Sequence, residues 1–134
     1  FLIDQLYNIR SITHVRRVLW DRYLNNFKSY NLFETPCIPD ECRHNGHIFH
    51  IRLKDKKERA LLMKFLEKKY NIKSSFHFVP LHSSLAGKEL GKFIGADDVT
   101  TTESEKILRL PIFNSMSLRQ VDYVCEKVLE FFND

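Results

Sequence analysis

The sequence has few of the features that mark non-globular protein classes. Its 134 residues include only four glycines and four prolines, which argues against disorder and collagen-like repeats. No apolar run approaches the roughly 18 residues of a membrane-spanning helix, and no internal repeat is present. Three cysteines (Cys37, Cys42 and Cys125) are too few and too irregularly spaced for a disulfide framework. We therefore expect a reduced, cytoplasmic setting.

Familiar catalytic signatures are also missing. The sequence holds no nucleophile elbow built on serine, no paired-carboxylate signature and no phosphate loop. Gly87, Gly91 and Gly95 recur every four residues, but this spacing matches no known phosphate cradle and is weak support for phosphate binding.

A cluster of potential metal ligands is the next candidate site. Cys37, Cys42, His44, His47 and His50 crowd into 14 residues, whereas structural zinc sites separate their ligand pairs by a longer spacer. His47 and His50 should also lie on opposite faces of a strand. We therefore expect ordinary loop cysteines and strand histidines, and no metal site.

The net charge of +4 is unevenly distributed. Residues 1–96 carry 17 Lys/Arg against 9 Asp/Glu, whereas residues 97–134 carry 4 against 8. The basic excess peaks between Arg52 and Lys73, which hold nine Lys/Arg between them. Such a run is compatible with an anionic partner. The solvated face of a helix explains it better, because the lysines fall between apolar positions at helical spacing.

Periodicity predicts a small two-layer α/β domain (α+β), in which a three-stranded sheet packs on helices. The expected elements are a long helix over 1–30, a loop over 31–46, a strand over 47–53, a helix up to Asn71, a strand over 72–79, an irregular or short-helical stretch over 81–100, a strand over 107–110 and a final helix. The first strand should bury Phe49, Ile51 and Leu53. The chain is long enough to bury about two thirds of its unfolded surface, so it can form its own core.

Helix ends and helix faces are also predictable. Asp55 should cap the middle helix, and its apolar residues should form a single stripe: Leu61, Leu62, Phe65, Leu66 and Tyr70. Thr102–Glu105 and Ser117–Gln120 both have the capping-box pattern. The final helix should turn six residues toward the core: Val121, Val124, Cys125, Val128, Leu129 and Phe132.

One segment resists a purely structural explanation. It runs Phe76-His77-Phe78-Val79-Pro80-Leu81-His82-Ser83-Ser84, so two histidines flank a proline where a strand should end. Ligands of open α/β sheets usually bind just beyond strand ends. Histidines there can hydrogen-bond a polar ligand or move protons near neutral pH. Two surface histidines beside a turn would have the same spacing, so spacing alone leaves both interpretations open.

This segment, continued by Ala86-Gly87-Lys88, resembles the motif H-Y-x-P-L-H-S-S-P-A-G of the DegT family of sugar aminotransferases. His47–Leu53 resembles the family strand H-x-F-x-I-x-L, and Thr101–Phe113 resembles T-x-E-S-E-R-L-L-R-L-P-L-F. The opening residues and the Arg16–Tyr23 stretch are similar to the long helix that leaves the family's large domain. The resemblance covers essentially the whole chain. The motif set is most similar to that of the dTDP-4-amino-4,6-dideoxygalactose (dTDP-4-keto-6-deoxyhexose) transaminases.

The resemblance implies the C-terminal small domain of an enzyme with the aspartate aminotransferase fold. Such enzymes are homodimers that use pyridoxal phosphate. They pass an amino group from L-glutamate to the 4-keto carbon of a dTDP-linked 6-deoxyhexose, in polysaccharide biosynthesis. By the same resemblance, five residues should lie near substrate or cofactor: His77, Phe78, Pro80, His82 and Ser83. Phe78 stands where the family has tyrosine, which removes a hydroxyl, and Leu85 replaces a proline, which puts the stiffness of the loop in doubt.

The resemblance also implies that essential groups lie elsewhere. Pyridoxal phosphate chemistry requires a Schiff-base lysine and an acidic partner for the ring nitrogen, and the family carries both in its large N-terminal domain. A Schiff-base lysine needs desolvation to lower its pKa, whereas the lysines here alternate on solvent-facing helical positions. We therefore expect that this chain has no catalytic residue, does not bind pyridoxal phosphate alone and is inactive by itself.

The start of the chain at Phe1, inside an apolar-periodic segment, fits this picture. We expect residues 1–30 to be the long helix leaving an absent large domain, and residues 31–134 to be the small domain. The partners of the complete enzyme would be a nucleotide-sugar and L-glutamate, with neither nucleic acid nor membrane. The alternative is a stand-alone or degenerate, non-catalytic binding module that uses the basic face between Arg52 and Lys73 for an anion.

Overall fold

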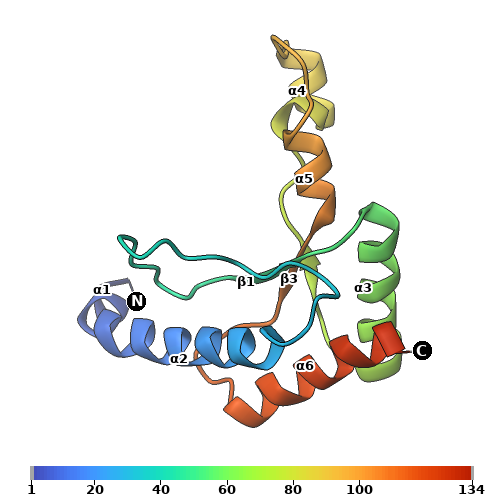
Figure 1. Cartoon of the computed structure of the whole chain (residues 1–134). Helices are drawn as coiled ribbons and strands as arrows, with labels where there is room; N and C mark the ends of the chain where they lie inside the picture. Colours follow the sequence, from blue (N-terminus) through green and yellow to red (C-terminus); the bar gives the residue numbers. More distant parts are fainter. Residues whose placement is uncertain (1, 134) are drawn as a thin grey trace.

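Three long helices and a small antiparallel sheet form the body of the protein (Figure 1). The computed structural model describes residues 2–133. Along the chain lie α1 (Leu2–Tyr7), α2 (Ile9–Phe27), β1 (Phe49–Arg52), α3 (Lys56–Tyr70), β2 (Ser75–Phe76), the 3-10 turn η1 (Leu81–Ser83), α4 (Leu85–Leu90), α5 (Thr100–Lys106), β3 (Ile107–Leu110) and α6 (Leu118–Asn133). The mixed α/β class and the three-stranded sheet expected from the sequence are confirmed.

The sheet has the order β1-β3-β2, and both pairings are antiparallel. Phe49 and Ile51 of β1 face the helices with Leu108 and Leu110 of β3, and all four are buried. Because side chains alternate along a strand, residues such as His50 point to the opposite face. The predicted apolar face of the first strand is therefore correct, although the strand covers 49–52 instead of 47–53.

The predicted strand over 72–79 is mostly wrong, because only Ser75 and Phe76 pair. Phe76 lies opposite Leu108, one residue from the first residue of β3. Residues after Phe76 therefore have almost no partner strand left to pair with. At the other end, the backbone N–H of Ile72 is already used by the end of α3, where it donates to the carbonyl of Leu66 at 2.9 Å.

The core lies between the inner face of the sheet and α2, α3 and α6. The second half of α2 is part of it through Leu19, Trp20, Tyr23 and Phe27. Tyr23 also donates a hydrogen bond to the carbonyl of Pro111 at 2.8 Å, and burial raises its pKa. The expected 1–30 helix is thus observed over 2–27 with a junction at Asn8, and its later turns belong to the same core as the sheet.

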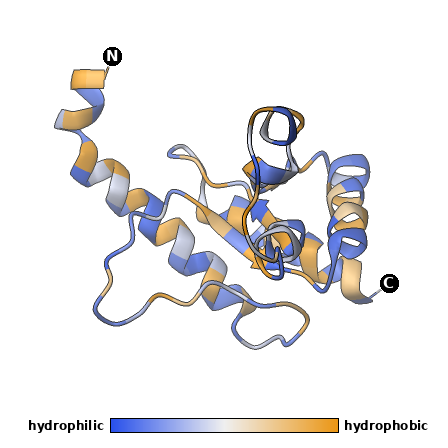
Figure 2. Ribbon diagram, turned by 90° about the horizontal axis from the view of Figure 1, so that it is seen from above, coloured by the Kyte–Doolittle hydropathy of each residue, from blue (hydrophilic) through white to orange (hydrophobic). Residues whose placement is uncertain are grey.

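The first turns of this N-terminal helix leave the body of the protein (Figure 2). The apolar residues of this helix recur every three or four positions and form a stripe along it; Leu2, Leu6 and Ile9 belong to this stripe, yet they are between 50% and 70% exposed. The apolar stripe is therefore buried at one end and open at the other.

Most predicted helix ends are confirmed. The carboxylate of Asp55 accepts a hydrogen bond from the backbone N–H of Glu58 at 2.8 Å. Asn71 ends α3 in the left-handed conformation, with φ of 53°. Ser117 and Gln120 form a reciprocal capping box, because each side chain accepts from the other's backbone N–H, at 3.3 and 2.8 Å.

Two helix predictions are wrong. Leu61, which the sequence pattern places on the single apolar stripe of α3, is 50% exposed, because α6 and β3 cover only the side of α3 that carries Leu62 and Leu66. The capping box at Thr102–Glu105 does not form. The helix α5 starts earlier, and Asp97 accepts from the backbone N–H of Thr101 at 3.1 Å. On α6, Val121, Val124, Cys125 and Val128 are buried, and Leu129 and Phe132 pack against the core as predicted.

Residues 77–106, here called the arm, rise away from the sheet and return through α5 into β3 (Figure 1). The turn η1 and helix α4 pack so closely that a Cβ at Gly87 would lie 1.7 Å from the carbonyl oxygen of Leu81. Glycine is therefore required at this position for packing. None of the helices within residues 2–133 combines the length and apolarity needed to cross a membrane.

Candidate functional site

A pocket lies where the arm leaves the sheet, and we call it the motif pocket. It has a volume of about 300 Å³. Four of the five residues proposed from the resemblance line it: His77, Phe78, Pro80 and Ser83. The other walls come from α3 and α5, whose lining residues are Lys56, Arg59, Thr101, Ser104 and Glu105. The structure thus brings most of the predicted residues together, at the end of a strand. Their contact with a substrate or cofactor stays a prediction.

His77 and Phe78 form the open rim of the motif pocket. Their ring centroids lie 5.0 Å apart in an edge-on arrangement. Phe78 is 74% exposed, although its side chain is apolar. An aromatic side chain in that position is available for contact with a ligand or with another part of the protein.

His82 has a different environment from the other motif residues. Its Nε2 lies 2.7 Å from a carboxylate oxygen of Asp97 and 3.2 Å from the hydroxyl of Thr101. The hydroxyl of Ser83 lies 3.1 Å from that of Thr101. Hydrogen bonds from Thr101 and then His82 hold the pKa of Asp97 below its usual range. His82 therefore connects η1 to the segment that leads into α5. It lines another pocket of the arm and is not among the residues that line the motif pocket.

Arg59 is a motif-pocket residue that the sequence did not reveal. Its guanidinium donates to the carbonyl of Ser104 at 3.0 Å and lies 5.4 Å from the ring centroid of Phe76. Its Nε is buried and has no hydrogen-bond partner among the described residues. Burial lowers the pKa of the guanidinium. Since Arg59 precedes the motif by some twenty residues, only the tertiary fold places it there.

His77 also borders a second pocket of about 320 Å³, which we call the sheet-face pocket. It lies over the outward face of the sheet, and His50 and Arg109 are among its lining residues. The three histidines of the Cys/His cluster considered as metal ligands in the sequence, His44, His47 and His50, also line this pocket. His47 is exposed, and its Nδ1 lies 2.7 Å from the side-chain oxygen of Asn45. No three His, Cys, Asp or Glu side chains within residues 2–133 are arranged to hold a metal ion.

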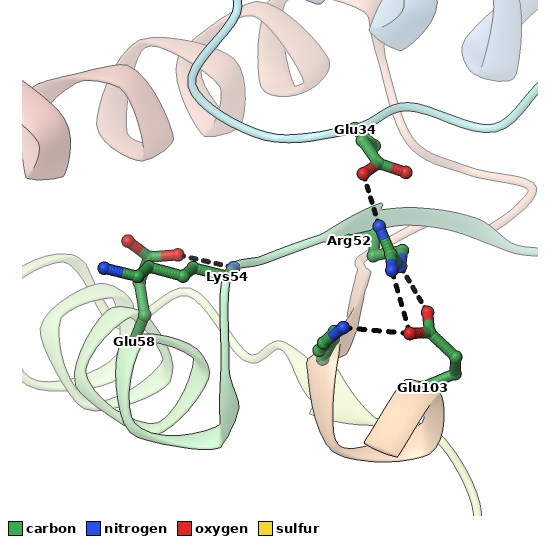
Figure 3. Close-up of polar contacts among 6 residues, drawn as sticks. Glu34, Arg52, Lys54, Glu58 and Glu103 are labelled. Carbon is green, nitrogen blue, oxygen red and sulfur yellow. Dashed lines mark hydrogen bonds and ion pairs between the residues drawn. The ribbon is translucent and has the colours of Figure 1, made fainter. Parts of the chain in front are cut away.

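The basic run between Arg52 and Lys73 is partly neutralised by carboxylates. Arg52 lies between Glu34 and Glu103 and hydrogen-bonds both (Figure 3). Contact with Arg52, followed by Lys106, lowers the pKa of Glu103 to about 2. Two further ion pairs join Lys56 to Glu105 at 2.6 Å and Lys69 to Glu130 at 2.8 Å. These contacts favour the interpretation of the run as a solvated, ion-paired surface.

Comparison with known proteins gives the family. Residues 1–129 match the DegT/DnrJ/EryC1/StrS aminotransferase family. The chain belongs to this family. The family named from the sequence motifs is therefore confirmed.

Individual relatives of this aminotransferase-family chain are much longer. It is 29% identical over 130 residues to the spore coat polysaccharide biosynthesis protein SpsC of Bacillus subtilis (strain 168), covering 94% of this chain and 33% of SpsC. Its fold is similar to the aminotransferase TlmJ from Streptoalloteichus hindustanus, with a TM-score of 0.84 and 20% identity over 96% of this chain and 34% of TlmJ. It is also similar to NtdA from Bacillus subtilis with bound cofactor PMP. The TM-score is 0.74 and the identity is 21%, over 91% of this chain and 28% of NtdA. The chain thus spans about a third of the length of SpsC and TlmJ.

The lysines of this family member do not fit the attachment of pyridoxal phosphate. Within residues 2–133, each lysine is either exposed or engaged by a glutamate. The most enclosed ammonium, that of Lys127, pairs with Glu126 at 2.7 Å and Glu130 at 3.1 Å, and these contacts raise its pKa. A Schiff-base lysine needs the opposite, a pKa lowered by desolvation.

Proposed function

We propose that this chain is the C-terminal domain of a pyridoxal phosphate-dependent sugar aminotransferase. The complete enzyme would pass an amino group from L-glutamate to the 4-keto carbon of a dTDP-4-keto-6-deoxyhexose. The observation that carries the proposal is the family match over residues 1–129 together with the motif pocket, which is built on the family's histidine motif. The naming of SpsC as a polysaccharide biosynthesis protein is consistent with a sugar substrate.

The cofactor would be held mainly by residues outside this chain. Pyridoxal phosphate supplies an electron sink for moving the amino group, and NtdA, whose fold is similar, has bound cofactor PMP. Since the described lysines do not fit its attachment, the chain alone is expected neither to bind the cofactor nor to catalyse the reaction. By the family resemblance, the complete enzyme would be a cytoplasmic homodimer with sites at the subunit interface.

The role of this chain would be to form one wall of the active site. His77 would hydrogen-bond the substrate from the rim of the motif pocket, with Phe78, Pro80 and Ser83 beside it. Lys56 on the α3 side of the same pocket is paired with Glu105, so Arg59 supplies the positive charge there. A guanidinium in that position suits a substrate that carries a diphosphate. His82 would be a positioning residue, because Asp97 and Thr101 hold it inside the arm.

The test uses the polypeptide extended at its N-terminus to the length of its family relatives. With L-glutamate and dTDP-4-keto-6-deoxyhexose as substrates, we expect the amino sugar to be detected by mass spectrometry. His77→Gln should lower kcat/KM by about tenfold or more, because it removes an imidazole hydrogen bond to substrate. His14→Gln, on an exposed position of α2 that lines neither pocket, is the matched control and should have no effect.

Two further outcomes separate the finer parts of this proposal. Amino transfer to a keto-sugar carried by another nucleotide, but not by dTDP, would overturn the dTDP assignment and keep the aminotransferase. Absence of transfer to any keto-sugar, together with salt-sensitive binding of nucleic acid by this chain, would instead support the alternative of a binding module with a basic face. The ion pairs of Arg52, Lys56 and Lys69 make that alternative the weaker one.

A further inference from the structure

The sheet-face pocket is lined by a cluster of basic side chains. They come from β1, from β3 and from the segment that follows β2. Arg109 of β3 lies directly opposite His50 of β1 and Ser75 of β2 in the sheet register. His77 follows Ser75 by two residues and lines the same pocket. Cross-strand neighbours on one face have side chains about 5 Å apart, so Arg109 lies in the middle of the cluster.

The polar ends of this cluster have no hydrogen-bond or ion-pair partner within residues 2–133. Arg109 is half-buried, yet it makes no hydrogen bond or ion pair with any residue of the described part of the chain. Arg52 lies on the same face of β1 and is held by two glutamates. The guanidinium nitrogens of Arg109 are not among the buried unpartnered polar atoms of residues 2–133, so they reach solvent and can donate to the oxygens of a ligand.

The chemistry of the pocket walls selects for an anion. No aspartate or glutamate lines the sheet-face pocket, whereas the motif pocket next to it contains Glu105. Trp20, Ile48 and Ile107 contribute apolar wall, which strengthens charge-assisted hydrogen bonds by limiting water. A guanidinium presents paired N–H donors that match the two oxygens of a carboxylate or phosphate.

We propose that Arg109, flanked by His50 and His77, binds an oxyanion group of a small-molecule ligand. Because His77 borders both pockets, the rest of that ligand would extend into the motif pocket. The inference deepens the proposed function and rests on it for the ligand's identity: the oxyanion would be the carboxylate of the amino donor or a phosphate of the nucleotide. Both present the same paired oxygens to Arg109.

The test is a nuclear magnetic resonance titration of this 134-residue chain with three probes: L-glutamate, inorganic phosphate and dTMP. We expect saturable shifts of the signals of Arg109, His50 and His77. Arg109→Gln should weaken binding by about tenfold or more, since it removes the charge and the paired donors. Arg119→Gln on the exposed start of α6 is the matched control and should bind as the unmodified chain does. Arg109→Lys keeps the charge without the planar donors, so it should fall between the two.

Each outcome has a defined meaning. Saturation by glutamate alone assigns the carboxylate source, and saturation by phosphate and dTMP alone assigns the phosphate source. Absence of saturation by all three, or equal binding by the Arg109→Gln variant with an otherwise unchanged spectrum, overturns the proposal. Because the readout is binding and involves no turnover, a lack of aminotransferase activity in the extended polypeptide would leave this result standing, and the two failures are distinguishable.

A second readout comes from the titration of His50. Burial, followed by the proximity of His77, lowers the pKa of His50. The other basic groups around the pocket are His44, His47 and Arg109. A bound anion favours the protonated imidazole, so the pKa of His50 should rise when the probe saturates the site. A merely structural Arg109 would produce no such shift.

Discussion

Single residues on the outward face of the sheet differ in how their charge is balanced. Arg52 is enclosed by Glu34 and Glu103, and Lys106 contacts the same Glu103 at 2.9 Å. These contacts connect the 31–48 segment, β1 and the C-terminal half of α5. Arg109 has no such partners within residues 2–133. The first arginine therefore has a structural role, while the second is available to a ligand.

The Arg52 cluster predicts a specific dependence on pH. Glu103 has a pKa of about 2 in the folded protein, compared with an ordinary value of 4.5. Its charged form thus contributes stability that is fully present above pH 4.5 and is lost as the pH falls toward 2. Glu103→Gln should have a lower urea midpoint at neutral pH and should lack this part of the acid-induced loss.

The control for this measurement is Glu41→Gln, which removes an exposed loop carboxylate. It should leave both the neutral midpoint and the acid profile close to those of the unmodified chain. If Glu103→Gln and Glu41→Gln gave the same acid profile, the cluster would not carry the proposed contribution.

Among the elements, the arm depends on side chain to backbone contacts more than on apolar burial. None of the residues of α4 or α5 is fully buried. The arm is instead held by Ser84, which caps α4 by accepting from the N–H of Gly87 at 2.9 Å, and by the contacts of His82 with Asp97 and Thr101. A segment stabilised in this way opens more readily than the core.

Gly87 offers a direct test of arm packing. Alanine there places a methyl group 1.7 Å from the carbonyl of Leu81, so η1 and α4 must separate. We expect a local destabilisation of about 1–3 kcal/mol, seen as faster amide exchange over 81–90 with little change in α6. Gly91→Ala is the control. A Cβ at Gly91 would lie 3.1 Å from the carbonyl oxygen of Gly87, so this substitution requires a much smaller shift than alanine at Gly87. Equal exchange in both variants would contradict the close packing described here.

Elements differ in how well the sequence predicts them, and the reason is the range of the interactions involved. Asp55, Asn71 and the Ser117–Gln120 box act within one helical turn, so their patterns are readable locally. The length of β2 depends on where β3 begins, some thirty residues later. Leu61 is exposed because of how far α6 extends over α3. These features follow from tertiary structure, which periodicity does not record.

At the scale of the whole molecule, the histidine motif of the sequence lies at a pocket, but the other residues that line this pocket are known only from the fold. The histidine segment located the motif pocket, whereas Arg59 and Arg109 reach the two pockets from α3 and β3. The partner of His82 was also unexpected, because Asp97 comes fifteen residues later through the arm. The motif therefore indicates where a pocket lies, whereas the charged side chains around that pocket come from segments that are distant in the sequence.

The central claim is that this chain supplies a wall of an aminotransferase site without the lysine that attaches the cofactor. Its most direct test is to mix the chain with pyridoxal phosphate, reduce with borohydride and map modified lysines by mass spectrometry. We predict no single lysine modified to completion in this chain, whereas the N-terminally extended polypeptide should show one such lysine outside residues 1–134. Stoichiometric modification of one lysine within residues 1–134 would contradict the account.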